Sequence, residues 1–170
     1  KKVGECRLTG KNHPDLFGTL AHAIVSQQLS GKAAATIFGR LCDLLGAQDQ
    51  KLQPAQLSAV TDVQLRSVGL SRAKALAVQD LALKIEQGIV LPLATLETLP
   101  DEAIIQNLIQ VRGIGRWTAE MFLMFQLGRT DVLPVDDLGV RKGFMLTYGL
   151  DAMPDKKLLT QHALQWQPYR

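Results

Sequence analysis

The stretch Val111–Ala119, VRGIGRWTA, places two glycines on either side of one apolar residue, between two segments of helical apolar spacing. Glycine permits the left-handed backbone that a tight turn between helices needs, and Ile114 can pack between the two helices. The turn also presents backbone N–H groups at the start of the second helix, where the helix dipole favours an anion such as a phosphate. The stretch therefore predicts a hairpin of two helices, serving either as a phosphate anchor or as an ordinary glycine turn.

Helix starts and stops recur along the rest of the chain. We expect helices over about 14–28, 32–45, 72–87, 101–111, 118–127, 137–146 and 154–166, with short ones opening at Pro54 and Thr61–Asp62. The short apolar run 89–91 lies between a glycine and a proline and does not predict a strand. These signals predict an all-α fold, an orthogonal bundle of about ten short helices.

The size and composition suit a single domain over residues 1–170. The 170 residues are 46% hydrophobic and 21% charged, which is ordinary for a globular chain with a real core. No apolar run approaches the length of a membrane span, so we expect no membrane crossing. The formal net charge of +3 permits nucleic-acid binding without requiring it.

The cysteines and histidines do not predict a metal or disulfide site. Cys6 and Cys42 cannot alone build a disulfide framework or an iron–sulfur cluster, and they suit an intracellular, reducing compartment. The three histidines, which lack a metal-ligand spacing, are His13, His22 and His162. The chain opens on Lys1 with no initiator methionine, so we expect it to be a fragment.

Two adjacent carboxylates precede a predicted helix in the segment Pro134–Lys142, PVDDLGVRK. Aspartate is a favoured N-cap, and capping alone explains the presence of one of the two residues Asp136 and Asp137. The other can face solvent or a cleft. A carboxylate at a helix N-terminus stays ionised at neutral pH, which is the state that stabilises an oxocarbenium-like sugar.

Together these segments resemble the helix–hairpin–helix DNA glycosylase superfamily, and most closely its 3-methyladenine DNA glycosylase II branch. The resemblance rests on the hairpin GIGRWTA, on Asp137 in PVDDLG, on Ile24–Ala34 (IVSQQLSGKAA), and on Val68–Ala75 (VGLSRAKA). It covers nearly the whole chain in order. It implies a helical barrel over about 20–130, with the terminal segments in a second lobe. Residues 166–170 resemble the approach to the family's last helix, which we expect this chain to lack.

The resemblance assigns roles to named residues. Asp137 matches the catalytic carboxylate, and Asp136 its neighbour in the base pocket. Gln28, or alternatively Gln27, matches the residue inserted into the gap that a flipped base leaves; an ordinary polar helix end is the other interpretation. The residues that match the phosphate anchor are Gly113, Gly115, Arg112, Arg116 and Thr118.

Trp117 and Met121 match the walls of the base pocket. Relatives that also cut the DNA backbone have a nucleophilic lysine at the position of Trp117, and tryptophan cannot form a Schiff base. The resemblance therefore implies a monofunctional enzyme, whose tryptophan stacks on a cationic alkylated base. The alternative for Trp117 is a core position against the hairpin.

No cofactor is expected, apart from a structural Na+ or K+ that the family often holds on hairpin carbonyls, here those of Val111 and Gly113. The implied partner is double-stranded DNA containing alkylated bases, bound by a monomer. Three alternatives remain open: a non-catalytic DNA-binding module, a glycosylase for oxidised or mismatched bases, and a helical protein of another role.

Overall fold

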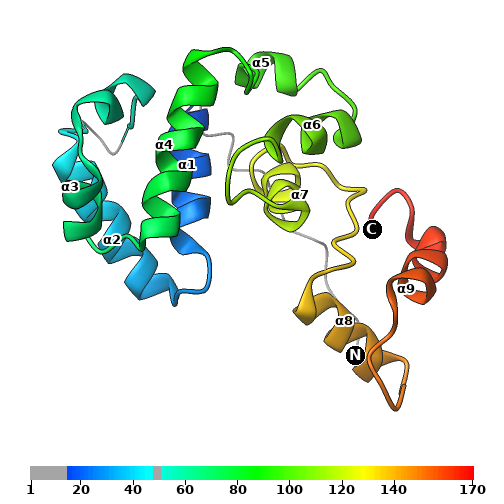
Figure 1. The fold of residues 1–170 in the computed structure, drawn as a ribbon. Helices are drawn as coiled ribbons and strands as arrows, with labels where there is room; N and C mark the ends of the chain where they lie inside the picture. Colours follow the sequence, from blue (N-terminus) through cyan, green and yellow to red (C-terminus); the bar gives the residue numbers. More distant parts are fainter. Residues whose placement is uncertain (1–14, 48–50) are drawn as a thin grey trace. The chain divides into compact units, whose positions relative to one another are not determined.

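The computed structural model describes residues 15–47 and 51–170 (Figure 1). The predictions made for Cys6, His13 and the first residue of the helix expected over about 14–28 lie outside this part of the chain. Every regular element in the described ranges is a helix, which confirms the all-α prediction. The elements are α1 (Leu16–Ser26), α2 (Gly31–Leu44), η2 (Pro54–Ala59), α3 (Asp62–Ser67), α4 (Arg72–Glu86), α5 (Leu93–Leu96), α6 (Asp101–Leu108), α7 (Arg116–Phe125), α8 (Leu138–Thr147), α9 (Lys156–Ala163) and η3 (Leu164–Trp166).

Side-chain caps decide where most of these helices begin. Asp15 accepts from the Gly18 N–H at 2.8 Å at the start of α1, and Ser71 accepts from Lys74 N–H at 3.3 Å at the start of α4. Such bonds satisfy N–H groups that have no partner inside the helix. The predicted start of α4 at residue 72 is therefore confirmed, and α1 begins at Leu16, directly after its cap.

A few predicted boundaries were wrong. Helix α2 begins at Gly31, because Ser30 caps it, and not at Lys32. Helix α7 begins at Arg116, directly after the hairpin, and not at Thr118. The single turn α5 was not predicted, and the last predicted helix ends in the 3-10 turn η3.

The described residues up to Arg116 form one compact unit. Within it, α4 packs against α1, α3 and η2, and α1 also packs against α2 (Figure 1). The largest side chains buried in this unit are aliphatic, as expected for a packed core. They include Leu20, Ile24, Leu41, Leu65, Leu81, Ile104 and Leu108.

Trp117–Arg170 belong to a second compact unit, with most of α7, all of α8 and α9, and η3. Phe144 is 6% exposed, and its ring lies against those of Tyr148, His162 and Trp166. The Arg170 guanidinium binds both oxygens of Asp131, at 2.6 and 3.0 Å. The predicted division into a barrel over about 20–130 and a second lobe stays a prediction.

No helix in residues 15–47 and 51–170 combines the length and apolarity needed to cross a membrane.

Candidate active site

Asp137 lies at the N-terminus of α8 with both carboxylate oxygens engaged. Oδ1 accepts the N–H of Val140 at 2.8 Å, and Oδ2 accepts the indole N–H of Trp117 at 2.8 Å. The Val140 bond has the largest effect on the pKa of Asp137; burial opposes it, and the bonds from Trp117 and Gly139 add to it, so the pKa lies below its ordinary value. Asp137 is therefore an ionised carboxylate at neutral pH that caps α8 and also binds a side chain of α7.

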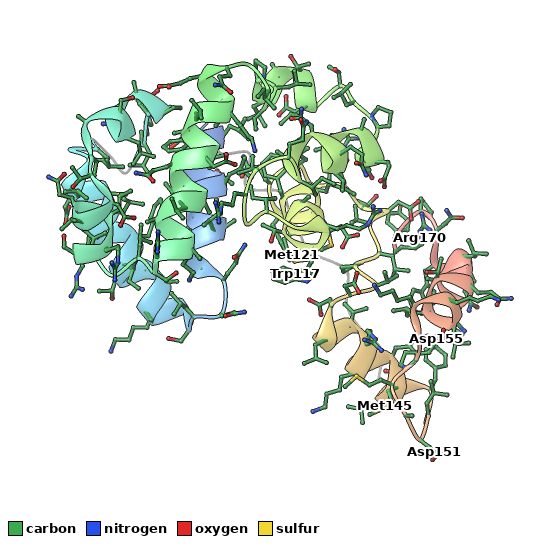
Figure 2. The ribbon with its side chains drawn as sticks, viewed as in Figure 1. Trp117, Met121, Met145, Asp151, Asp155 and Arg170 are labelled. Atoms are coloured by element: carbon green, nitrogen blue, oxygen red, sulfur yellow. The ribbon has the colours of Figure 1, made fainter. Side chains whose placement is uncertain are left out.

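Trp117 lies in the first turn of α7 and is 41% exposed, so the alternative core position is wrong. Met121 follows it by one helical turn and is half-buried. Figure 2 shows the two side chains next to one another on α7. The pair gives one side of α7 an aromatic and a thioether group, and the indole of Trp117 binds Asp137.

Gly139 is a site residue that sequence reasoning missed. A Cβ added at this position would lie 3.1 Å from Oδ1 of Asp137, closer than side chains normally approach. Because glycine has no Cβ at this second position of α8, the Asp137 carboxylate has space to accept the N–H of Val140. The signal was present in the quoted segment PVDDLG, where a glycine follows the carboxylate by two residues.

Asp136 has a different environment from Asp137. One of its oxygens lies 2.5 Å from the ammonium of Lys156, and both side chains are largely exposed. An exposed pair of this kind contributes about 0–1 kcal/mol to stability. The structure thus separates the two adjacent carboxylates, since the Trp117 bond goes to Asp137 and the lysine to Asp136.

The hairpin of the first unit has its two glycines for different reasons. Gly113 has φ +78°, and a Cβ there would lie 3.1 Å from the Cβ of Ala77 on α4. Gly115 has ordinary φ, and the space where its Cβ would be is open. Ile114 is 4% exposed, as predicted for the residue between the two helices. Open space beside a helix N-terminus suits the close approach of a phosphate.

The three basic and polar neighbours of the hairpin differ in availability. The Arg116 guanidinium forms two bonds to Glu102, at 3.0 and 2.7 Å, while the Arg112 residue is exposed. Thr118 is only 6% exposed, so its hydroxyl does not face solvent and its predicted phosphate role rests on its N–H. The bonds to Arg116, and then to Gln106, lower the pKa of Glu102 to about 2.

The two glutamines after α1 have separate positions. Gln27 donates from Nε2 to the carbonyl of Gly113 at 2.8 Å. Gln28 is exposed and has φ +58°. The sequence does not predict that one glutamine binds the hairpin while the other is exposed, because the two are adjacent and of the same type.

The hairpin carbonyls suit a monovalent cation. Val111 O accepts the N–H of Ile114 at 3.1 Å, and Gly113 O accepts from Gln27. A carbonyl oxygen has two lone pairs, so each keeps one for an ion. Among the described residues no group of three His, Cys, Asp or Glu side chains is placed to hold a metal.

Comparison with known proteins places this geometry in a family. The sequence model of the HhH-GPD superfamily base excision DNA repair proteins matches residues 21–168. The DNA-3-methyladenine glycosylase 1 of Schizosaccharomyces pombe is 34% identical over 154 residues, which is 91% of this chain and 67% of that protein.

Two solved structures are similar along nearly the whole chain. A DNA-3-methyladenine glycosidase from Bacillus halodurans superposes with a TM-score of 0.85 at 42% identity, over 98% of this chain and 75% of that one. The S. pombe 3-methyladenine DNA glycosylase in complex with abasic DNA superposes at 0.81 with 32% identity, over 100% and 81%. The chain belongs to the HhH-GPD superfamily of base excision DNA repair proteins.

Proposed function

We propose that the chain is a monofunctional DNA glycosylase, which hydrolyses the N-glycosidic bond of alkylated purines of the 3-methyladenine kind in base excision repair. The observation that supports it most is the ionised carboxylate of Asp137, bound by the indole of Trp117. Relatives that are 32–42% identical bear the names 3-methyladenine DNA glycosylase or glycosidase. The substrate class follows theirs.

Asp137 supplies the charge that the reaction needs. As the bond between C1′ and the base nitrogen breaks, its electron pair leaves with the base and the sugar becomes oxocarbenium-like. An alkylated purine is cationic, so it departs neutral and needs no separate proton donor. The Asp137 carboxylate stabilises the sugar cation and orients a water, whose oxygen bonds to C1′ and whose proton is released.

Trp117 supplies recognition and limits the reaction to hydrolysis. Its half-exposed ring offers a π face to an electron-poor, cationic base. An indole nitrogen cannot attack C1′ to form a Schiff base, so the product is an intact abasic site. Met121, one turn along, adds a polarizable wall to the same pocket.

The hairpin holds the DNA backbone. Its N–H groups at Gly115 and the start of α7 bind a phosphate, and Arg112 and Arg116 add positive charge, so affinity falls as salt rises. The carbonyls of Val111 and Gly113 would hold a Na+ or K+, which would add positive charge near that phosphate. The partner is duplex DNA with an alkylated base, bound by a monomeric, intracellular enzyme that rotates the lesion out of the stack.

The test is a single-turnover assay on alkylated duplex DNA with the parent chain, Asp137→Asn and Asp136→Asn. The parent and Asp136→Asn should release free alkylated base, and Asp137→Asn should not. Strands should break only after alkali, and borohydride should trap no protein–DNA adduct.

Two results would contradict the proposal. DNA binding without base release by the parent would favour the non-catalytic module. Equal release by Asp137→Asn would remove the assigned carboxylate.

A further inference from the structure

The loop between α1 and α2 holds one residue in an unfavourable backbone conformation. Gln28 has φ +58°, and among the described residues it is the one non-glycine residue with positive φ. The left-handed region is costly for side chains other than glycine and persists where surrounding contacts impose it. The Leu29 N–H donates to the Ser26 carbonyl at 3.2 Å and closes a turn in which Gln28 takes the position of positive φ. Two further residues, distant in sequence, bind this turn.

Lys74 of α4 binds the backbone on the N-terminal side of Gln28. Its ammonium donates to the carbonyls of Val25 and Gln27, at 2.7 Å each. These carbonyls lie at the C-terminal end of α1, where such groups lack helical partners and a cation is favoured. The lysine therefore fixes the chain immediately before Gln28.

Gln27 binds the same loop to the hairpin. Its side-chain amide donates to the carbonyl of Gly113 at 2.8 Å, across 86 positions of sequence. The side chain of Gln27 is thus used within the protein, while Gln28 is exposed. Gln27 is therefore bound at two points. Lys74 donates to its carbonyl, and its side-chain amide donates to the hairpin.

One stripe of α4 supports both the loop and the hairpin. Lys74 binds the loop, and Asp80 accepts the N–H of Arg112 at 2.7 Å. The Cβ of Ala77 would lie only 3.1 Å from a Cβ added to Gly113. Lys84 binds Asp80 at 2.9 Å and the carbonyl of Gln110. Positions 74, 77, 80 and 84 lie toward one side of α4. This single helix therefore sets the distance between the loop and the hairpin.

We propose that Gln27 and Lys74 are positioning residues that hold Gln28 in the left-handed conformation, so that Gln28 enters the DNA stack while Gly113–Gly115 hold a phosphate. This rests on the proposed function. Gln27 itself does not enter the DNA. Its amide sets the register between the inserted side chain and the anchored backbone.

The first experiment uses the free protein and needs no DNA. Gln27→Glu keeps the shape of the side chain but places a carboxylate oxygen against the Gly113 carbonyl. Gln28→Glu is its control, because it adds the same charge at the next residue. Lys74→Met keeps the stem and removes the donors, with Lys51→Met, an exposed lysine, as its control for charge. Amide hydrogen exchange should accelerate over 25–30 and 111–115 in Gln27→Glu, and over 25–30 in Lys74→Met. Both controls should exchange like the parent, and equal exchange in all four variants would overturn the proposal.

The second experiment separates insertion from positioning. Excision from lesion duplex is compared with excision from the same lesion in single-stranded DNA, where no stack has to be filled. Gln28→Ala and Gln27→Glu should each lower the duplex rate by roughly 10- to 100-fold and leave the single-strand rate within about twofold. Their double variant should be no slower than the slower single variant, because Gln27 acts through Gln28.

A duplex rate unchanged in Gln28→Ala but lowered in Gln27→Ala would make Gln27 the inserted residue and overturn the assignment. If the parent excises nothing, the proposed function fails, and the exchange experiment still decides whether Gln27 and Lys74 hold the loop.

Discussion

The indole N–H of Trp117 lies 2.8 Å from Oδ2 of Asp137, across 20 positions of sequence and between two helices of the same unit. This bond joins a residue expected to contact the base with a residue expected to stabilise the sugar. It lowers the pKa of the carboxylate, after the larger effect of Val140. It also leaves the Trp117 ring half-exposed, with its nitrogen engaged and its face available.

Trp117→Phe should move the acid limb of the pH–rate profile to higher pH. Excision requires ionised Asp137, whose depressed pKa keeps activity present above that pKa and removes it as pH falls through it. Losing the indole donor raises the pKa of Asp137 toward its ordinary value, so activity is lost at a higher pH. Single-turnover rates on a permanently cationic lesion measure the limb. Phe125→Leu, which removes an exposed ring from the same helix, should leave the limb in place.

Gly139→Ala should lower excision without lowering stability. The added methyl displaces Oδ1 of Asp137 by a few tenths of an ångström, since its Cβ would lie at 3.1 Å. A rate loss of roughly 10-fold or more is expected from such misplacement. Gly143→Ala on the same helix meets open space and is the control. Gly143→Ala should gain about 0.5–1 kcal/mol from helix propensity, measured by urea unfolding. Gly139→Ala should gain less, because Oδ1 of Asp137 also caps α8. A parent-like rate in Gly139→Ala would contradict the steric argument.

Asp137→Asn should separate capping from chemistry. Asparagine caps helices about as well as aspartate, so α8 keeps its N-terminal bond to Val140, and the urea midpoint should stay near that of the parent. The missing charge should lower single-turnover excision by about 100-fold or more. Asp137→Ala should in addition lose about 0.5–2 kcal/mol of stability, because it also removes the cap. A large loss of stability in the asparagine variant would show that the charge, or the bond from Trp117 that the amide NH2 cannot accept, serves the fold.

Glu102→Gln should weaken the pairing between Glu102 and Arg116 and so favour binding of Arg116 to the DNA backbone. The carboxylate has a pKa of about 2 beside the guanidinium, so the pair is fully formed at neutral pH. Without it, affinity for duplex DNA should rise, and the slope of log affinity against log salt should steepen by about 0.9, the value for one phosphate. Glu86→Gln is the control, because it makes the same change of net charge at an exposed site. Equal slopes in the two variants would mean that Arg116 does not bind phosphate.

Phe144→Ala should be the most destabilising of these substitutions. The ring is 6% exposed and contacts three aromatic rings from α8, α9 and η3. Truncation of a buried phenylalanine costs about 3–5 kcal/mol. Leu146→Ala on the same helix, at 67% exposure, should change the free energy of unfolding by about 0.5 kcal/mol or less. Chemical denaturation compares the two, and a small loss in Phe144→Ala would show that the aromatic cluster is not a packing centre.

Local signals predicted the helices well, because they act within a few residues. A cap bonds to an N–H three residues on, and helical periodicity repeats every three or four, so Ser71 and Asp155 announced α4 and α9 before any packing was known. The sequence signals were less accurate for helix boundaries that depend on two neighbouring residues together. The helix expected from about residue 32 begins at Gly31, because Ser30 caps it there.

By itself, the sequence determined the all-helical class, the glycine hairpin, the family, and the candidate carboxylate pair. It left Asp136 and Asp137, and Gln27 and Gln28, distinguished only by resemblance. The tertiary structure gave the members of each pair different partners distant in sequence: Trp117 and Lys156 for the aspartates, Gly113 and Lys74 for the glutamines. Hydrogen bonds between groups 20 to 86 positions apart form only once packing brings their helices together, so residue spacing does not encode them.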